Sequence, residues 1–429
     1  MGLDELSKVF ADDVAAGRAE DVADEENVHP VSLARSANKQ IPFRNDNKKA
    51  KTNAMDAMEK RKGRNERRKL TGMIEMQYNF PLLPGQGEQW RERLRWAVEQ
   101  LHPDNADELR PTFRAERLAQ RAIAAKWLGS AVENTWIVCG GHHGTLVSML
   151  AAELAGKTIA VDEISYTGAL EQGKMLGAKL VGVAFDHEGM RADALRSVCE
   201  RERAAGTGVS AIYTMPTVHN PLGCVAGLER RREIVEVARE FDLLIIQDDA
   251  YAYMEADAPA SYAELAPERT FYTRGLSKSY APATCTGFLV APDRFAAGIQ
   301  NAVKNSTTGT ALVNNIAALS LVADGTVDAV ITRKLEEGAR RNAAARALLG
   351  EAAFPGARCA WHLWVTLPEG LSAEEVEARC RAKGALVSGG NGFAAPGVVA
   401  RGLRIGLGGE VDADRTVEGV RIVAEVLRR

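Results

Sequence analysis

The chain has 429 residues, of which 46% are hydrophobic, and its 54 basic and 57 acidic residues leave a formal net charge of -3. This length allows two or three domains with buried cores, and this charge gives no overall attraction to nucleic acid or to an anionic membrane. No apolar stretch approaches the roughly 20 residues of a membrane-spanning helix. The acidic start of the chain lacks the apolar core of a secretion signal. Because the six cysteines show no paired spacing, we expect a cytoplasmic protein with reduced thiols and no metal site.

Residues 1–74 differ in composition from the rest of the chain. Acidic residues at 19–26 are followed by basic clusters between 48 and 69. Two interpretations stay open: an arm that binds nucleic acid or a partner, and a solvated, partly helical extension. The acids offset the basic run and favour the second interpretation.

From residue 77 onward the sequence alternates between strand and helix patterns. The expected elements, in chain order, are a helix over 115–129, a strand, glycine turn and helix over 135–156, a strand and loop over 157–166, a helix over 168–178, a strand over 179–185, a strand and polar turn over 210–223, a helix over 228–242 and a buried strand over 243–251. This alternation predicts an α/β fold with a mostly parallel sheet covered by helices on both faces.

The pattern changes after about residue 325. A long polar-faced helix over 332–350 precedes a strand over 359–368, a helix over 372–384 and a strand over 401–409. We therefore predict a charged extension at 1–74, a large domain at 75–325 and a small α+β domain at 326–429.

Polar clusters fall where the expected strands end. They are Gly140–His143, Ser165–Tyr166, His219–Asn220, Asp248–Tyr251 and Arg274–Lys278. Ligands of open α/β sheets bind at the carboxyl ends of the strands. The five clusters are therefore expected to meet in one site.

A lone lysine near a strand-end acid suggests chemistry on an aldehyde cofactor. The Lys278 amine can form a Schiff base with an aldehyde, and a pyridine-ring cofactor needs an acid such as Asp248 near its ring nitrogen. Tyr166 could stack on the ring. The glycine-rich segment GGHHGT opens a helix and suits a phosphate, and Arg404 could hold a substrate carboxylate.

Several segments in the same order carry a resemblance to a known family. They are YTMPTVHNPLGCVAGLERRREIVEVARE, LLIIQDDAYAYM, LSKSYAPATCTGFLVAP, GARCAWHLWVTLPEG and RGLRIGLGG. Over about residues 75–425 the chain resembles fold-type I pyridoxal phosphate enzymes of the class I/II aminotransferase family. It is most similar to 2-aminoadipate and kynurenine aminotransferases and to the aminotransferase domain of MocR-type regulators.

The resemblance implies a seven-stranded, mostly parallel sheet, pyridoxal 5'-phosphate as cofactor, and a homodimer with shared active sites. Lys278 would carry the Schiff base and move a proton, and Asp248 would pair with the ring nitrogen. Further roles follow by position: Gly141 and His142 at the phosphate, Ser277 also on the cofactor, Tyr166 on the ring face, Asn220 and Tyr251 on the ring oxygen, and Arg404 on the substrate carboxylate.

The sequence departs from the family pattern at the phosphate end. Cys285 and Thr286 stand where the family usually has an arginine, and Gly275 stands where it usually has a serine. We expect Arg274 or His142 to supply the lost contact, and Cys285 to be a small buried side chain. A tyrosine that the family sends from the partner subunit is also missing, since Phe113 is the only aromatic residue at 101–125.

These residues favour transfer of an amino group between an α-amino acid and a 2-oxo acid, in a specialised biosynthetic enzyme. Two alternatives stay open. One is a β/γ-elimination or replacement lyase, because the same cofactor supports it. The other is the aminotransferase-like sensor domain of a regulator, although residues 1–70 are short for a DNA-binding module and its linker. The substrate side chain is not determined by these motifs.

Overall fold

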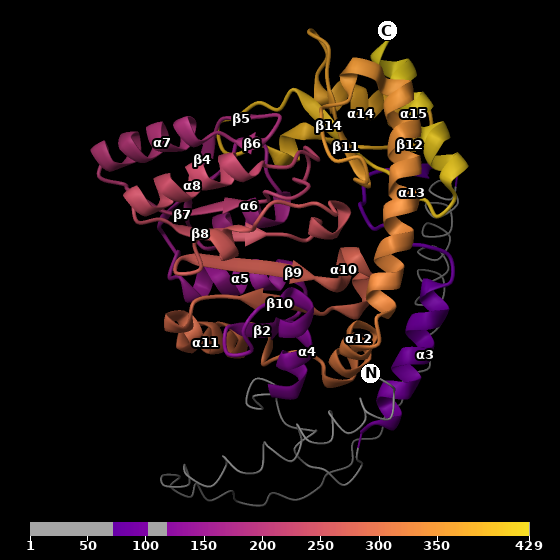
Figure 1. Ribbon diagram of the computed structural model, residues 1–429. Coiled ribbons are helices and arrows are strands. Elements are labelled where there is room, and N and C mark those ends of the chain that lie inside the picture. The colour runs from indigo at the N-terminus through magenta and orange to yellow at the C-terminus, as the bar shows by residue number, and fades with distance from the viewer. Residues whose placement is uncertain (1–71, 102–117, 429) are drawn as a thin grey trace, which may run out of the picture. The chain divides into compact units, whose positions relative to one another are not determined.

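The structure is a computed structural model that describes residues 72–101 and 118–428 (Figure 1). The predicted extension therefore lies outside the described residues, except for its last three positions. Phe113 also lies outside them. A seven-stranded sheet dominates the described part, in the order β2 (Thr135–Val138), β10 (Gly287–Val290), β9 (Thr270–Gly275), β8 (Leu244–Asp248), β7 (Val209–Thr214), β3 (Thr158–Asp162), β4 (Lys179–Val183). Strand β10 is antiparallel to both neighbours and the other pairs are parallel. The expected α/β fold is confirmed.

Helices cover both faces of this sheet, as its sequence predicts. One face packs against α5 (Gly141–Ala151), α6 (Thr167–Met175) and α11 (Ala296–Thr307), and the other against α7 (Ala192–Ala204), α8 (Leu228–Glu240) and α9 (Tyr262–Leu265). Successive strand residues point to opposite faces. Ile245 and Ile246 on β8 accordingly belong to the two different cores. Burial on both faces explains why these strands are apolar at nearly every position.

A helical cluster packs beyond β10 and β2. It contains α3 (Gln86–Glu99), α4 (Leu118–Leu128), α12 (Leu312–Ala323) and the single turn α10 (Leu276–Ser279). Phe288 of β10 is fully buried in this cluster beside Leu276 and Tyr280. The short helix that carries Lys278 is therefore anchored by apolar residues on each side of it.

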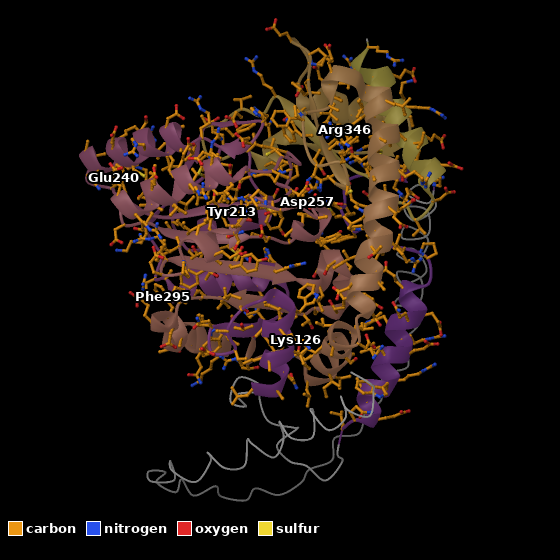
Figure 2. All side chains as sticks on the ribbon, in the orientation of Figure 1. Lys126, Tyr213, Glu240, Asp257, Phe295 and Arg346 are labelled. Atoms are coloured by element: carbon orange, nitrogen blue, oxygen red, sulfur yellow. The ribbon has the colours of Figure 1, made fainter. Side chains whose placement is uncertain are left out.

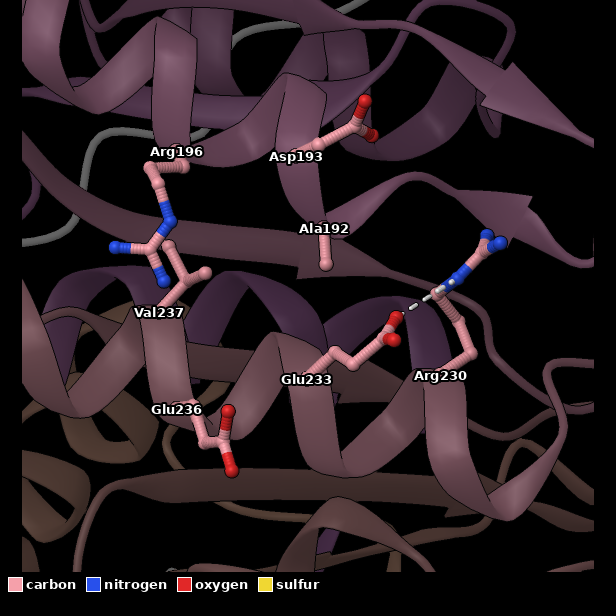
Figure 3. Close-up of a pocket in the computed structure, with 7 residues that line it drawn as sticks. All are labelled: Ala192, Asp193, Arg196, Arg230, Glu233, Glu236 and Val237. Carbon is pink, nitrogen blue, oxygen red and sulfur yellow. Dashed lines mark ion pairs between the residues drawn. The ribbon is translucent and has the colours of Figure 1, made fainter.

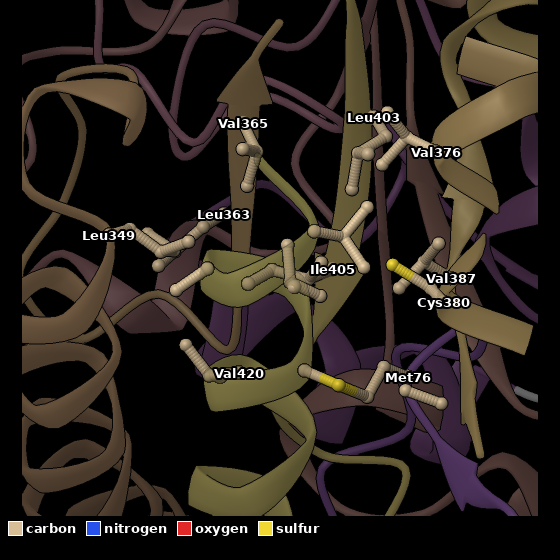
Figure 4. Close-up of a cluster of buried hydrophobic side chains, with 14 of the residues drawn as sticks. Met76, Leu349, Leu363, Val365, Val376, Cys380, Val387, Leu403, Ile405 and Val420 are labelled. Carbon is tan, nitrogen blue, oxygen red and sulfur yellow. The ribbon is translucent and has the colours of Figure 1, made fainter. Parts of the chain in front are cut away.

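The C-terminal part forms a second layer of strands and helices. An antiparallel sheet runs in the order β11 (His362–Thr366), β14 (Gly402–Gly406), β13 (Ser388–Gly389), and it packs with α14 (Ala373–Ala382) and α15 (Ala413–Leu427). Its core includes Leu363, Ile405 and Val420 (Figure 4). Strand β1 (Ile74–Glu75) joins this region by pairing with β12 (Ala385–Leu386). Residues 74–76 thus pack with the C-terminal core.

The long helix α13 (Thr326–Leu349) joins the two regions. It contacts α10 and α12 at one end and β11 and α15 further along (Figure 1). The described residues from Ile74 onward belong to one compact unit, so the predicted boundary near residue 325 stays a prediction.

The remaining elements are short: β5 (Phe185–Asp186), β6 (Gly189–Met190), and single turns η2 (Ala252–Met254), η3 (Pro282–Thr284), η4 (Asp293–Phe295), η5 (Gly350–Ala352), η6 (Gly390–Phe393).

Among the described residues, no helix taken singly has the length and apolar character to cross a membrane. Two helices meet that test of length and composition only when they are counted together: Leu312–Ala323 and Thr326–Ala352. The chain bends by 71° between them.

A fully buried arginine shapes the loop after β7. Arg231 on α8 donates hydrogen bonds of 2.9–3.1 Å to the carbonyl oxygens of Ala226 and Pro216 and to the hydroxyl of Thr217. It also reaches the carbonyls of residues 259 and 260. Loop carbonyls that would otherwise be buried without a donor are thereby satisfied. This loop carries Asn220, whose peptide bond to Pro221 is cis.

Replacing this arginine by methionine tests its role. We expect Arg231→Met to lower the free energy of unfolding by about 3 kcal/mol or more, because several buried carbonyls lose a charged donor. Urea unfolding followed by circular dichroism measures the change. Arg232→Met, at an exposed neighbour on the same helix, is the matched control. Equal stability of the two variants would contradict this account.

Candidate active site

Lys278 lies where β9 runs into α10, at the carboxyl edge of the large sheet. The side chain is half-buried, and its Nζ donates a 2.6 Å hydrogen bond to the carbonyl oxygen of Asn79. Nζ also lies 4.1 Å from the centroid of the Phe80 ring and 5.6 Å from that of Tyr251. The amine is therefore held between the N-terminal loop and the strand-end residues.

The surroundings of this amine favour its neutral form. Burial and the positive charge of Arg404 together lower the pKa of Lys278 to about 7, against the opposing effect of the Asp248 carboxylate. A neutral lysine amine is a nucleophile, whereas its protonated form is not. The site thus supplies a reactive amine near neutral pH.

Asp248 ends β8 and is almost completely buried. One carboxylate oxygen accepts a 3.0 Å hydrogen bond from the hydroxyl of Tyr213 on β7, and the other accepts one of 3.1 Å from the backbone N–H of Ala250. Figure 2 labels Tyr213. Burial raises the pKa of Asp248, against the effect of these hydrogen bonds and of Lys278. The carboxylate is consequently fixed in one orientation, and the charge of Lys278 acts on it.

Arg404 on β14 brings the C-terminal sheet to the same site. Its Nη1 donates a 2.9 Å hydrogen bond to Oδ1 of Asn220, and its Nη2 donates to the carbonyl of Gln77. The Phe393 ring centroid lies 4.9 Å from the guanidinium carbon. Its Nε is buried with no hydrogen-bond partner among the described residues. A buried donor of this kind requires an acceptor, which a substrate carboxylate can provide.

Two tyrosines complete this side of the site. Burial raises the pKa of Tyr166 to about 12 and raises that of Tyr251 as well, and Arg404 acts in the opposite direction on both. Both hydroxyls therefore remain protonated donors at neutral pH. Tyr166 stands at the start of α6, and its ring meets His142 edge-on at 6.1 Å between centroids.

The phosphate end is a cradle of glycine backbone at the start of α5. Gly140 adopts a φ of 86°, which favours glycine, and a Cβ on Gly275 would lie 2.9 Å from the backbone nitrogen of Gly141. A Cβ on Gly287 would lie 2.5 Å from Gly140, and the hydroxyl of Ser277 also faces Gly140. The first N–H groups of a helix lack partners within it and attract anions. At these glycines the backbones of β9, β10 and α5 therefore lie in direct contact.

The two histidines at this helix start differ in environment. His142 is exposed, whereas His143 is buried and accepts a 3.0 Å hydrogen bond from the N–H of Cys139. The other ring nitrogen of His143 lies 2.8 Å from the hydroxyl of Ser306. Burial lowers the pKa of His143 to about 4, so this ring is neutral and structural. His142 is the histidine whose side chain remains available at the cradle.

Arg274 points away from the cradle. Its guanidinium carbon lies 4.3 Å from the centroid of the Trp127 ring on α4. The next residue, Gly275, faces Gly141, and successive strand residues point to opposite faces. The predicted phosphate role of Arg274 or His142 stays a prediction, and this geometry favours His142.

The prediction for Cys285 is wrong. The structure places this cysteine on the surface, in the left-handed region with a φ of 45°. The residue follows the turn η3 rather than lying within β10, so the apolar run after it does not draw it into the core.

Several residues of the site lack any motif in the sequence. Asn79 holds the Lys278 amine through its carbonyl, and its amide donates a 2.9 Å hydrogen bond to Nδ1 of His362. The Nε2–H of that fully buried ring in turn donates to the carbonyl of His219. His219 lies 3.4 Å from Asp162, and both side chains are buried. The loop NFPLLPGQG has a turn composition, but nothing in it indicates these long-range partners.

A polar groove of about 340 Å³ lies elsewhere, between α7 and α8 (Figure 3). Its lining residues are Ala192, Asp193, Arg196, Arg230, Glu233, Glu236 and Val237. Arg230 pairs with Glu233 at 3.5 Å, and Arg196 pairs with Glu240. The arginines of the groove are thus already neutralised, and none of the predicted site residues lies in it.

The fold is an α/β fold with a half-buried lysine amine at the carboxyl edge of its large sheet. Residues 105–415 match the family described as aminotransferase class I and II. The match spans well over half of the sequence, so the chain belongs to the class I and II aminotransferase family. It is an enzyme of amino-group transfer with the fold-type I architecture, and its cofactor is pyridoxal 5'-phosphate.

Relatives and solved structures agree with this family. The chain is 27% identical over 320 residues to the 2-aminoadipate transaminase of Thermus thermophilus, covering 72% of this chain and 79% of that one. It is 23% identical over 268 residues to the uncharacterized HTH-type transcriptional regulator YdeF of Bacillus subtilis, covering 61% of this chain and 57% of the regulator. The structure of a kynurenine aminotransferase from Pyrococcus horikoshii superposes with a TM-score of 0.73 at 23% identity, covering 83% and 91% of the two chains.

The residues present fit this cofactor. Because glycine has no side chain, the cradle leaves room beside the N-terminus of α5. The buried Asp248 is close enough to Lys278 for its charge to act on the amine. The partnerless Nε of Arg404 adds an unsatisfied donor for a substrate anion.

The acidity of Lys278 gives a pH-dependent prediction. In the cofactor-free protein, acetylation of Lys278 by acetic anhydride is expected to rise with a midpoint near pH 7, because burial and Arg404 disfavour the protonated amine. Peptide mass spectrometry measures the labelling, and the exposed Lys174 provides the comparison. An ordinary lysine titrates near pH 10.4. A midpoint for Lys278 in that range would refute the assignment.

The cradle predicts that the usual family serine does not fit at position 275. We expect Gly275→Ser to weaken binding of pyridoxal phosphate by about tenfold or more, because its Cβ crowds the nitrogen of Gly141. Absorbance titration measures the affinity. Gly208→Ser, where a Cβ meets nothing within 4 Å, is the control. Tighter binding by Gly275→Ser would show that the serine restores a phosphate contact.

Proposed function

We propose that the protein transfers an amino group between an α-amino acid and a 2-oxo acid, with Lys278 as the catalytic residue. The observation that carries this proposal is the Lys278 amine at the carboxyl edge of the sheet, held by the carbonyl of Asn79 and subject to the charges of both Asp248 and Arg404. The reaction needs three groups around the cofactor: an amine, an acid and a cation that binds a carboxylate.

Each group has a role that follows from its surroundings. Pyridoxal phosphate supplies an aldehyde and a ring that accepts electrons from the substrate. Asp248, fixed by Tyr213 and Ala250, holds a proton on the ring nitrogen. Arg404 uses its free Nε–H to bind the α-carboxylate and orient the α-carbon. The neutral Lys278 amine would accept the α-proton and return it to the aldehyde carbon of the cofactor.

The remaining predicted contacts surround these three groups. Tyr166 stacks on the ring, Tyr251 and Asn220 hydrogen-bond the ring oxygen, and the phosphate sits on the backbone of Gly141 with His142 and Ser277 beside it. Their convergence supports this arrangement, since Asn220 bonds Arg404 and Tyr166 contacts His142.

We further propose that the enzyme acts as a cytoplasmic homodimer in a biosynthetic pathway. The six free cysteines support a reducing compartment. Its similarity to the 2-aminoadipate transaminase of Thermus thermophilus supports a biosynthetic amino acid as substrate.

Asp248→Asn tests the proposal in two half-reactions. The variant is expected to convert the bound cofactor with an amino donor about 100-fold more slowly than the unaltered protein, because a neutral amide does not keep the ring nitrogen protonated. Absorbance follows the conversion, and a 2-oxo acid should restore the original spectrum. Asp257→Asn, at an exposed position labelled in Figure 2, is the control. Release of ammonia and a leaving group, without cofactor conversion, would identify a lyase instead.

A further inference from the structure

A second lysine lies beneath the turn that carries Lys278. Lys334 on α13 has no exposed surface, and its Nζ donates hydrogen bonds of 2.8 Å to the carbonyl oxygen of Lys278 and 2.6 Å to that of Tyr280. These two carbonyls bracket the end of α10, which is only four residues long. Carbonyls at the end of a helix lack partners within it. Lys334 therefore caps the helix that presents the active-site amine.

The long helix beneath this cap is itself held in place. The indole nitrogen of Trp361 donates a 3.0 Å hydrogen bond to the carbonyl of Lys334. A Cβ at Gly338, one turn further along α13, would lie 2.5 Å from that same indole nitrogen. From the other side, the amide of Gln86 donates to the carbonyl of Tyr280. Lys334 is thus a rigid support for α10 rather than a mobile surface group.

The chemistry of this contact differs from that of a salt bridge. Among the described residues no carboxylate pairs with Lys334, and an unpaired buried cation is unfavourable. Burial, together with the charge of Lys278, lowers the pKa of Lys334 to about 7. The neutral amine has two N–H groups, and the structure provides two carbonyl acceptors for them. Hydrogen-bond geometry, not charge attraction, fixes this side chain.

We propose that Lys334 is a positioning residue, which holds the peptide groups at Lys278 and Tyr280 so that the Lys278 amine meets the cofactor aldehyde. This inference rests on the proposed function of Lys278. The charged groups that act on the two amines are Arg404 and Asp248 for Lys278, and Lys278 itself for Lys334.

The experiment compares three variants of the full chain. Lys334→Met removes both donors but retains the length of the side chain, Lys334→Gln keeps two neutral donors on a shorter one, and Arg333→Met changes the exposed neighbour on the same helix. Each is stripped of cofactor and mixed with pyridoxal phosphate. Absorbance gives the rate of loading, and cyanoborohydride reduction with peptide mass spectrometry verifies attachment at Lys278.

Lys334→Met is expected to load about tenfold or more slowly than the unaltered protein, as misplacement of a reacting group predicts. Lys334→Gln should recover part of the rate, and Arg333→Met should behave like the unaltered protein. Equal loading rates for Lys334→Met and the unaltered protein would overturn the proposal. Failure of the unaltered protein to become modified at Lys278 would instead overturn the proposed function.

A measurement on the unaltered protein keeps the proposal testable if both variants at position 334 fail to fold. In the loaded enzyme, acetic anhydride should label Lys334 about a hundredfold more slowly than Lys174, because a lysine with both donors bonded reacts only after local opening. Labelling of Lys334 at the rate of this surface lysine would show that the cap does not persist in solution, and would refute the proposal.

Discussion

The proposed chemistry depends on one amine, Lys278, whose protonation is set by its removal from water and by a nearby cation and acid. Removing the Lys278 amine from water disfavours its charged form, and Arg404 acts in the same direction. Asp248 acts in the opposite direction and limits the shift. The result is an amine that changes protonation near pH 7, where it can both attack a carbonyl and move a proton.

The groups that surround this amine are held by polar contacts from distant parts of the chain. The carbonyls of Gln77 and Asn79, in the loop before α3, accept hydrogen bonds from Arg404 and Lys278. Asn220 reaches Arg404 from a loop that the buried Arg231 supports. Because each such donor or acceptor would be costly to bury alone, the contacts fix one arrangement of the loops. The helix that carries Lys278 is supported in the same way by Lys334.

The phosphate end shows how a family pattern can change without loss of the fold. Glycines at 140, 275 and 287 let the start of α5 approach β9 and β10 at backbone distance. A serine at 275 would crowd this contact, which gives a steric reason for the departure at this position. Cys285 then lies at the surface in a left-handed turn, outside the cradle.

The sequence by itself determined the α/β class, the mostly parallel sheet, the family and its cofactor, because these depend on hydrophobic periodicity and on local motifs such as the one around Lys278. It also brought the candidate residues to one sheet edge, since the carboxyl ends of parallel strands converge. Only the tertiary structure decided the direction of Arg274, the exposure of Cys285, and the roles of Asn79, His362 and Lys334. Those features depend on which face of a strand a side chain leaves, and on hydrogen bonds between residues such as 79 and 278, which no local pattern records.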